Sequence, residues 1–178
     1  MVPTAWCSSC DVCCRFPEKD SFLAPYFTPD EIIAIPLMNP PLFPFAKGEK
    51  KRIGDNVDLA GCKITLIPYK EGYICPAFDP ATAHCKIYNE RPVDCILYPY
   101  AIMWDANGEE VVLGMDTKCP YVQEHMEDQS LKDASIEIAL AIESSPLLDI
   151  FSANMGLIGP YQDDVIPLQA LKRLTSSV

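Results

Sequence analysis

Four cysteines stand within eight residues near the start of the chain. Cys7, Cys10, Cys13 and Cys14 form the pattern C-x-x-C-x-x-C-C. Gaps of two residues let neighbouring thiolates face one metal ion, while the backbone N–H groups between them point at the sulfurs. The spacing also matches the first three ligands of a loop that binds a four-iron, four-sulfur cluster. The run therefore predicts a metal-binding loop.

The adjacent pair at the end of this run restricts how the loop is used. In an extended backbone, the side chains of Cys13 and Cys14 point to opposite sides. We therefore expect that the pair does not bind one ion together, and that the chain has either two nearby sites or one site and a core thiol. Eight thiols would form two sites of four cysteines, a ligand set that suits Zn²⁺ or an iron–sulfur cluster.

Five further cysteines are spread over the rest of the chain without forming a local pair: Cys62, Cys75, Cys85, Cys95 and Cys119. The fold must bring remote thiols to the N-terminal loop if they share its metal. Metal-binding energy then becomes part of the folding energy. A proline follows Cys75 and Cys119, as it follows the last ligand of ferredoxin-type loops, although proline also ends strands.

A second cysteine-bearing run extends from Cys85 to Cys95 with the form C-x-I-Y-x-x-R-P-x-x-C, and Tyr98-Pro99 follows it. With the N-terminal run before it and the late Cys119-Pro120 after it, residues 7–120 resemble the YkgJ-type cysteine-cluster family, a zinc- or iron-chelating domain. The resemblance implies eight metal-linked cysteines: Cys7, Cys10, Cys13, Cys14, Cys75, Cys85, Cys95 and Cys119. Cys62 lies outside the pattern and is expected to be a thiol without a metal role.

The same cysteine domain occurs joined to flagellin lysine-N-methylases. This chain has no glycine-rich loop for S-adenosylmethionine, and 178 residues leave little room for a methyltransferase domain. We therefore do not extend the methylase activity to it. No sequence feature sets a general base beside a particular thiol, so we predict no catalytic residues and favour a protein that is not an enzyme.

Three other residues have types that suit a metal site. His84 and His125 could each complete a site of three cysteines and one histidine, but both are expected to be surface histidines. Arg91 is expected either to donate to thiolate sulfurs and offset their charge, or to support the core beside Pro92.

Composition limits the partners and the compartment. The net charge of −11 would repel phosphate backbones and anionic membrane surfaces, so we expect neither nucleic acid nor membrane as a partner. No secretory leader or transmembrane stretch stands out, so a cytoplasmic location is expected. A reducing compartment and an odd count of nine cysteines favour metal ligands over a disulfide scaffold.

Short elements must position the thiols. Thr28 and Glu31 predict a capping box for a short helix with Ile32, Ile33 and Ile35 as its apolar face. Two β-hairpins are predicted, one over residues 63–75 and one over residues 100–115 with its turn at Asn107-Gly108. The last third is predicted to be helical, with Leu131, Ala134, Ile138 and Ile142 on one face of a helix, Ile136 and Leu140 on a second covered face, and a last helix over residues 167–174.

Together these features predict an α+β fold: a small, irregular, metal-stapled domain with short β-hairpins and C-terminal helices. We expect residues 1–120 to form the cysteine-cluster domain and residues 121–178 a helical extension packed on it. The expected function is zinc or iron chelation without catalysis, through the C-x-x-C-x-x-C-C cluster and the remote cysteines. The alternative is an iron–sulfur protein that acts in electron transfer, or as an accessory to a methylase-like or redox enzyme. The sequence names no protein partner.

Overall fold

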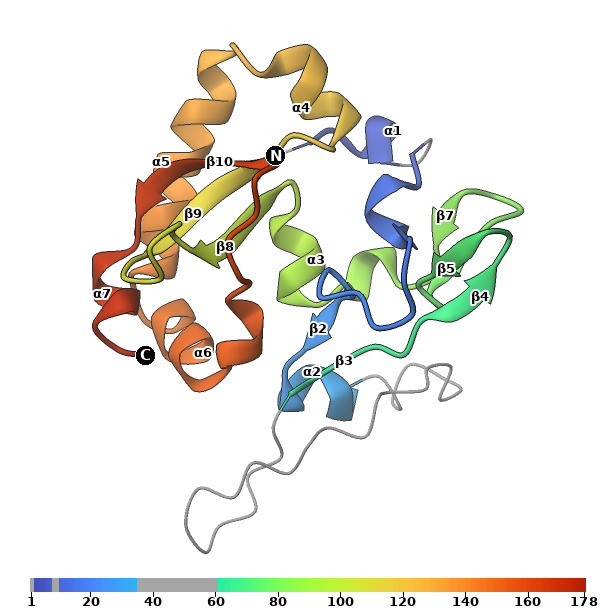
Figure 1. Ribbon diagram of the computed structural model, residues 1–178, viewed down its shortest axis with the longest axis horizontal. Helices are drawn as coiled ribbons and strands as arrows, with labels where there is room; N and C mark the ends of the chain where they lie inside the picture. Colours follow the sequence, from blue (N-terminus) through green and yellow to red (C-terminus); the bar gives the residue numbers. More distant parts are fainter. Residues whose placement is uncertain (1, 8–9, 35–60) are drawn as a thin grey trace, which may run out of the picture. The chain divides into compact units, whose positions relative to one another are not determined.

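The computed structural model describes residues 2–7, 10–34 and 61–178 (Figure 1). Helices and small antiparallel sheets are mixed along the chain, which confirms the predicted α+β class. The chain forms two compact units, one of Cys7–Ile96 and one of Met1–Trp6 with Leu97–Val178. The predicted division into domains at residue 120 stays a prediction.

The Cys7–Ile96 unit is built from very short elements. Its strands are β1 (Arg15–Phe16), β2 (Tyr26–Phe27), β3 (Cys62–Lys63), β4 (Ile67–Tyr69), β5 (Gly72–Ile74), β6 (Phe78–Asp79) and β7 (His84–Cys85). Its helical segments are the end of α1 (Thr4–Cys7), η1 (Val12–Cys14), α2 (Pro29–Ala34), η3 (Tyr88–Glu90) and most of α3 (Val93–Leu97).

Within the described part of this unit, the strands form three small antiparallel sheets. One sheet has the order β1-β5-β4, and two further pairs are β2-β3 and β6-β7. The predicted first hairpin is present as β4 and β5, with Lys70 in the turn at a φ of 52°. Its first strand begins later than predicted, because Lys63 pairs with Tyr26 in the separate β2-β3 ladder.

The helix α2 begins with the predicted capping box. The Thr28 N–H donates to Glu31 Oε2 at 2.8 Å, and the Glu31 N–H donates to Thr28 Oγ1 at 3.3 Å. Ile32 packs against the core, whereas Ile33 is 57% exposed, so the predicted apolar face is wrong at this residue. Ile35 lies outside the described residues.

The core of this unit contains aromatic and aliphatic side chains together with a cysteine. Phe16, Phe27, Leu66, Ile74 and Cys75 are buried in one cluster, among others. Cys14 and Cys85 are partly buried against the same cluster. Thiols are therefore part of the hydrophobic core of this unit.

The other unit contains longer elements. The strands β8 (Tyr100–Trp104), β9 (Val111–Asp116) and β10 (Val165–Ala170) form an antiparallel sheet in the order β10-β9-β8. The helical segments are α4 (Pro120–His125), α5 (Gln129–Ile142), α6 (Leu147–Ala153), η4 (Met155–Leu157) and α7 (Lys172–Thr175). The β8–β9 hairpin confirms the predicted one, and Gly108 in its turn has a φ of 71°, which favours glycine.

The end of the chain contradicts the predicted helix over residues 167–174. Residues 165–170 form β10, which lies beside β9 in Figure 1, and only Lys172–Thr175 is helical. Every residue of β9 is buried, so its second edge needs a hydrogen-bonding partner inside the fold. That requirement arises from the sheet and is not visible in the local pattern of residues 167–174.

The long helix α5 buries one face, as predicted, through Leu131 and Ile142. The second predicted stripe is not covered, because Ile136 is 47% exposed and Leu140 is 66% exposed. None of the helices in the described part of the chain is long and apolar enough to cross a membrane.

Candidate metal centre

The N-terminal cysteine run contains a tight turn that brings two sulfurs together. Val12–Cys14 is a turn of 3-10 helix, and the Cys14 N–H donates to the Asp11 carbonyl at 3.0 Å. The Asp11 carboxylate pairs with the Arg15 Nε across this turn. The Sγ atoms of Cys13 and Cys14 lie 3.9 Å apart.

This geometry corrects the expectation that Cys13 and Cys14 point apart. That expectation assumed an extended backbone, and the observed backbone is helical at both residues. Sulfurs bound to one tetrahedral zinc are about 3.8 Å apart, because each Zn–S bond is about 2.3 Å. The observed separation of 3.9 Å is therefore compatible with both thiolates binding one ion.

Strand pairing brings Cys75 beside this turn. β1 follows Cys14 directly and pairs with β5, with Arg15 opposite Ile74. The next residue, Cys75, donates its N–H to the Cys14 carbonyl at 3.0 Å. A backbone hydrogen bond thus joins two positions, 14 and 75, that are 61 residues apart in the sequence.

Cys85 reaches the same region through the β6–β7 pair. The Phe78 N–H donates to the Cys75 carbonyl at 2.9 Å, which turns the chain from β5 into β6. Phe78 is then opposite Cys85 in the β6–β7 register. Cys14, Cys75 and Cys85 consequently belong to one hydrophobic cluster.

Cys95 lies on α3, and its electrostatics connect it to the other thiols. Burial raises the pKa of the Cys95 thiol well above its usual value, and the charges of Asp94, Cys75, Cys13 and Cys85 raise it further. Burial also raises the pKa of Cys75 to about 11, with smaller contributions from Cys85 and Cys13. The thiols of Cys13, Cys14, Cys75, Cys85 and Cys95 are therefore close enough to influence one another's ionisation.

Within this group, Cys13 differs from its neighbour. The hydrogen bond between the two thiols lowers the pKa of Cys13, although burial opposes this. The same hydrogen bond, followed by burial, raises the pKa of Cys14 well above its usual value. Either sulfur can donate in this contact, and the two thiols therefore share one proton between them when one of them is ionised.

Arg91 brings a positive charge to this group of thiols. Its guanidinium lies 3.9 Å from the centroid of the Tyr88 ring, and its Nε donates to the Tyr88 carbonyl at 2.9 Å. Its positive charge lowers the pKa of Cys13 and opposes the effect of burial on Cys85. These shifts support the predicted role of Arg91 in offsetting thiolate charge, and direct donation to a sulfur stays a prediction.

Cys7 and Cys10 stand at the beginning of the N-terminal run. Cys7 ends α1, and the Cys10 N–H donates to its carbonyl at 3.4 Å. Residues 8 and 9 between them lie outside the described part of the chain.

Cys62 is half-buried in β3 opposite Phe27, where burial raises the pKa of its thiol.

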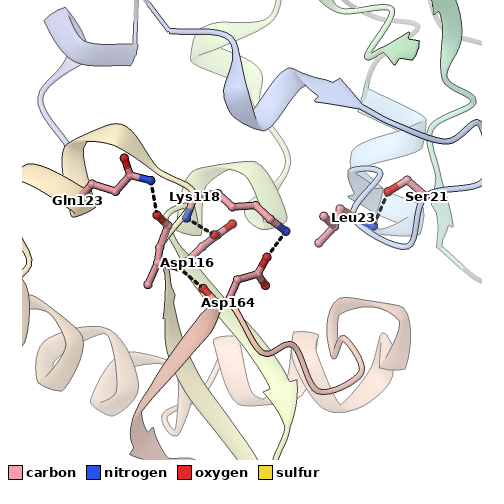
Figure 2. Close-up of polar contacts among 7 residues, drawn as sticks. Ser21, Leu23, Asp116, Lys118, Gln123 and Asp164 are labelled. Atoms are coloured by element: carbon pink, nitrogen blue, oxygen red, sulfur yellow. Dashed lines mark hydrogen bonds and ion pairs between the residues drawn. The ribbon is translucent and has the colours of Figure 1, made fainter. Parts of the chain in front are cut away.

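Cys119 belongs to the other unit, and polar contacts join the residues around it, among them Asp116, Lys118, Gln123 and Asp164 (Figure 2). Asp116 accepts the Cys119 N–H at its carbonyl (3.3 Å) and the Lys118 N–H at Oδ1 (2.7 Å). The Lys118 ammonium pairs with Asp164, and the Gln123 side-chain amide donates to the Thr117 carbonyl at 2.8 Å. The buried Cys119 then precedes α4.

The two histidines differ in their surroundings. His84 is exposed in β7, as expected for a surface histidine. His125 is partly buried: its ring packs at a tilt against Tyr121 and edge-on against Trp6, and Nδ1 lies 2.9 Å from Asp128 Oδ2.

Soft, crowded thiols are the donor set that zinc and iron prefer. In the described residues, no three Cys, His, Asp or Glu side chains already form a group that could hold an ion. Backbone pairing places Cys14, Cys75 and Cys85 at one cluster. The chemistry of the donors thus fits zinc or iron, whereas the full ligand set of eight cysteines stays a prediction.

Sequence reasoning missed the contacts that hold α3. The Val93 N–H donates to Glu31 Oε1 at 2.7 Å, and the Tyr26 N–H donates to Asp94 Oδ2 at 2.8 Å. Burial raises the pKa of Asp94 to about 6. The capping-box pattern identified Glu31, but no local signal indicates its second partner.

Comparison with known proteins gives one match. Residues 6–120 match the family model CxxCxxCC, which is described as "Putative zinc- or iron-chelating domain". No curated protein and no solved structure matches the chain. The match covers well over half of the 178 residues and confirms the resemblance inferred from the cysteine pattern. The chain therefore belongs to the CxxCxxCC family of zinc- or iron-chelating domains.

Proposed function

We propose that this protein binds zinc or iron through cysteine thiolates, and that the bound metal staples the Cys7–Ile96 unit. The observation that carries the proposal is the gathering of Cys13, Cys14, Cys75, Cys85 and Cys95 in one unit, with the first two sulfurs 3.9 Å apart. The remaining proposed ligands are Cys7, Cys10 and Cys119. The family match supports chelation.

The electrostatics support a strong coupling between metal and fold. Burial raises the pKa of Cys75 and Cys95, so these thiols keep their protons near neutral pH when no cation is present. Thiolates are the form that binds metal, so binding releases protons and replaces mutual repulsion with attraction to the cation. Arg91 offsets part of the remaining negative charge.

An iron–sulfur centre is the second candidate, and one observation favours it. The spacing of Cys7, Cys10 and Cys13 matches the first three ligands of a loop that binds a four-iron, four-sulfur cluster. A cluster would suit a role in electron transfer or as an accessory to a methylase-like or redox enzyme. We propose a cytoplasmic, non-catalytic protein without nucleic-acid or membrane partners, in keeping with the net charge of −11.

Elemental analysis of protein purified without oxygen tests these candidates. Stoichiometric zinc in a colourless protein supports the zinc centre. Iron with inorganic sulfide and broad visible absorption supports the cluster. Purification in air is the matched control, because oxygen strips clusters and lets zinc replace iron. Both candidates would be contradicted if the anaerobic protein contains substoichiometric metal and its cysteines are free or disulfide-bonded.

A further inference from the structure

One carboxylate serves the N-termini of two helices in the Cys7–Ile96 unit. Glu31 Oε2 accepts the Thr28 N–H at 2.8 Å and so completes the capping box of α2. Glu31 Oε1 accepts the Val93 N–H at 2.7 Å, 62 positions further along the chain. Val93 is the first residue of α3, and N–H groups at a helix start have no partner within the helix.

A second hydrogen bond joins α3 to the strand that precedes α2, and in this bond α3 provides the acceptor. Asp94 Oδ2 accepts the Tyr26 N–H of β2 at 2.8 Å, across 68 positions. One hydrogen bond therefore runs from the α3 backbone to an α2 side chain, and the other from the β2 backbone to an α3 side chain. Because they act on consecutive residues, they fix both the position and the rotation of the first turn of α3.

This turn carries Cys95, which directly follows Asp94. The helix α3 has only five residues, Val93–Leu97, and a helix this short is not stable by its own hydrogen bonds. Contacts from outside the helix must therefore decide where Cys95 lies. Val93 and Asp94 provide two of those contacts.

We propose that Glu31, with support from Asp94, is a positioning residue for metal binding at Cys95. The inference rests on the proposed metal-binding function. Glu31 touches no metal itself. It holds the helix start from which the Cys95 thiolate reaches the other sulfurs.

The test compares Glu31→Ala, Glu31→Gln and Thr28→Ala in the full chain. Zn²⁺ affinity is measured by competition with a chelator, and Co²⁺ loading reports the number of bound thiolates through its charge-transfer and ligand-field absorption. We expect Glu31→Ala to lower Zn²⁺ affinity about 10- to 100-fold, the range seen when groups that orient metal ligands are removed. The Co²⁺ spectrum should show one thiolate fewer. Glu31→Gln keeps one acceptor oxygen and should fall between this variant and the wild type.

Thr28→Ala is the matched control. It removes the acceptor of the Glu31 N–H and weakens the cap of α2, but it leaves the Glu31 carboxylate and its bond to Val93 in place. This variant should unfold at a lower temperature and keep wild-type Zn²⁺ affinity and a wild-type Co²⁺ spectrum. A merely structural role of Glu31 predicts instead that both variants lose metal in proportion to their lost stability.

The outcomes separate the inference from the function on which it rests. Wild-type protein without metal would overturn both, before any variant is measured. A wild type that binds metal, with Glu31→Ala folded and unchanged in affinity and spectrum, would overturn the inference alone. If Glu31→Ala does not fold, Glu31→Met decides, because methionine keeps the length of the side chain but has no carboxylate oxygen for the Val93 N–H: wild-type affinity and spectrum overturn the inference, and reduced affinity with an altered Co²⁺ spectrum supports it.

Discussion

The two compact units differ in what holds their elements in place. In the Cys7–Ile96 unit, strands of two or three residues are joined by turns, and thiols occupy part of the core. In the unit that contains Leu97–Val178, strands of five and six residues pack with a 14-residue helix, and side chains such as Leu113 and Phe151 are fully buried. The first unit also buries an apolar cluster of its own, which includes Phe16, Phe27 and Leu66. Under the proposed function, bound metal adds to the stability of this unit, whereas the other unit depends on its longer packed elements.

Of the changes considered, metal removal should produce the largest difference between the two units. A chelator should expose the backbone amides of β1, β4 and β5 to hydrogen exchange, while β8, β9 and β10 stay protected. Structural metal contributes on the order of 10 kcal/mol to the folding of small metal-binding domains. Hydrogen exchange measured by mass spectrometry with and without metal checks this. Equal loss of protection in both sheets would show that the units do not differ in this way.

Replacing single cysteines should give the next largest effect. Cys13→Ser removes the thiolate with the lowered pKa and should lose metal and about 4 kcal/mol of unfolding free energy, a size typical of lost metal sites. Cys62→Ser is the control, because Cys62 lies outside the family pattern. It should keep the metal and most of the stability. Metal analysis and denaturant titration measure both, and similar effects of the two variants would contradict the proposed ligand set.

Truncating a core side chain in the other unit should lower its stability without changing the affinity for metal. Leu113 is fully buried in β9, so Leu113→Ala should lower the unfolding free energy by about 2–5 kcal/mol. The same variant should bind Zn²⁺ with wild-type affinity. Thermal unfolding and chelator competition on one sample provide the check. A parallel drop in metal affinity would mean that the packing of this sheet also supports the metal centre.

The smallest predicted effect concerns alkaline pH. Burial raises the pKa of Tyr100, whose hydroxyl donates to the Leu131 carbonyl at 2.8 Å. The folded state holds this proton more tightly than the unfolded state, so stability should fall as pH rises above about 10, the usual pKa of tyrosine. Tyr100→Phe should cost about 1 kcal/mol at neutral pH and reduce this alkaline loss. Tyr161→Phe, at an exposed tyrosine of the same unit, should change neither quantity.

Local chemistry made several features predictable. Thr28 and Glu31 stand at the spacing of a capping box, and both of its hydrogen bonds are present. Asn107-Gly108 predicted the turn between β8 and β9, because this turn needs a residue that accepts positive φ. Each of these signals involves residues close together in the sequence, so no knowledge of the rest of the fold is needed.

Other features depended on partners far away in the sequence. Residues 167–170 belong to β10, which pairs with β9, although a helix was predicted over residues 167–174. Ile33 and Leu140 are exposed, although their apolar character predicted burial. Periodicity shows which face of an element is apolar, but whether another element covers that face depends on the tertiary fold.

The sequence by itself determined the family and its chemistry. Cysteines at two-residue gaps, followed by the Cys85–Cys95 run, identify a thiolate chelator, because ligand type and local spacing are properties of the chain. Only the tertiary structure decided how the thiols meet. The 3-10 turn places the Cys13 and Cys14 sulfurs 3.9 Å apart, and the β1–β5 pairing brings Cys75 to them. Glu31 holds the helix that bears Cys95. Such contacts join residues tens of positions apart, and hydrogen bonds of that range leave no local signature in a sequence.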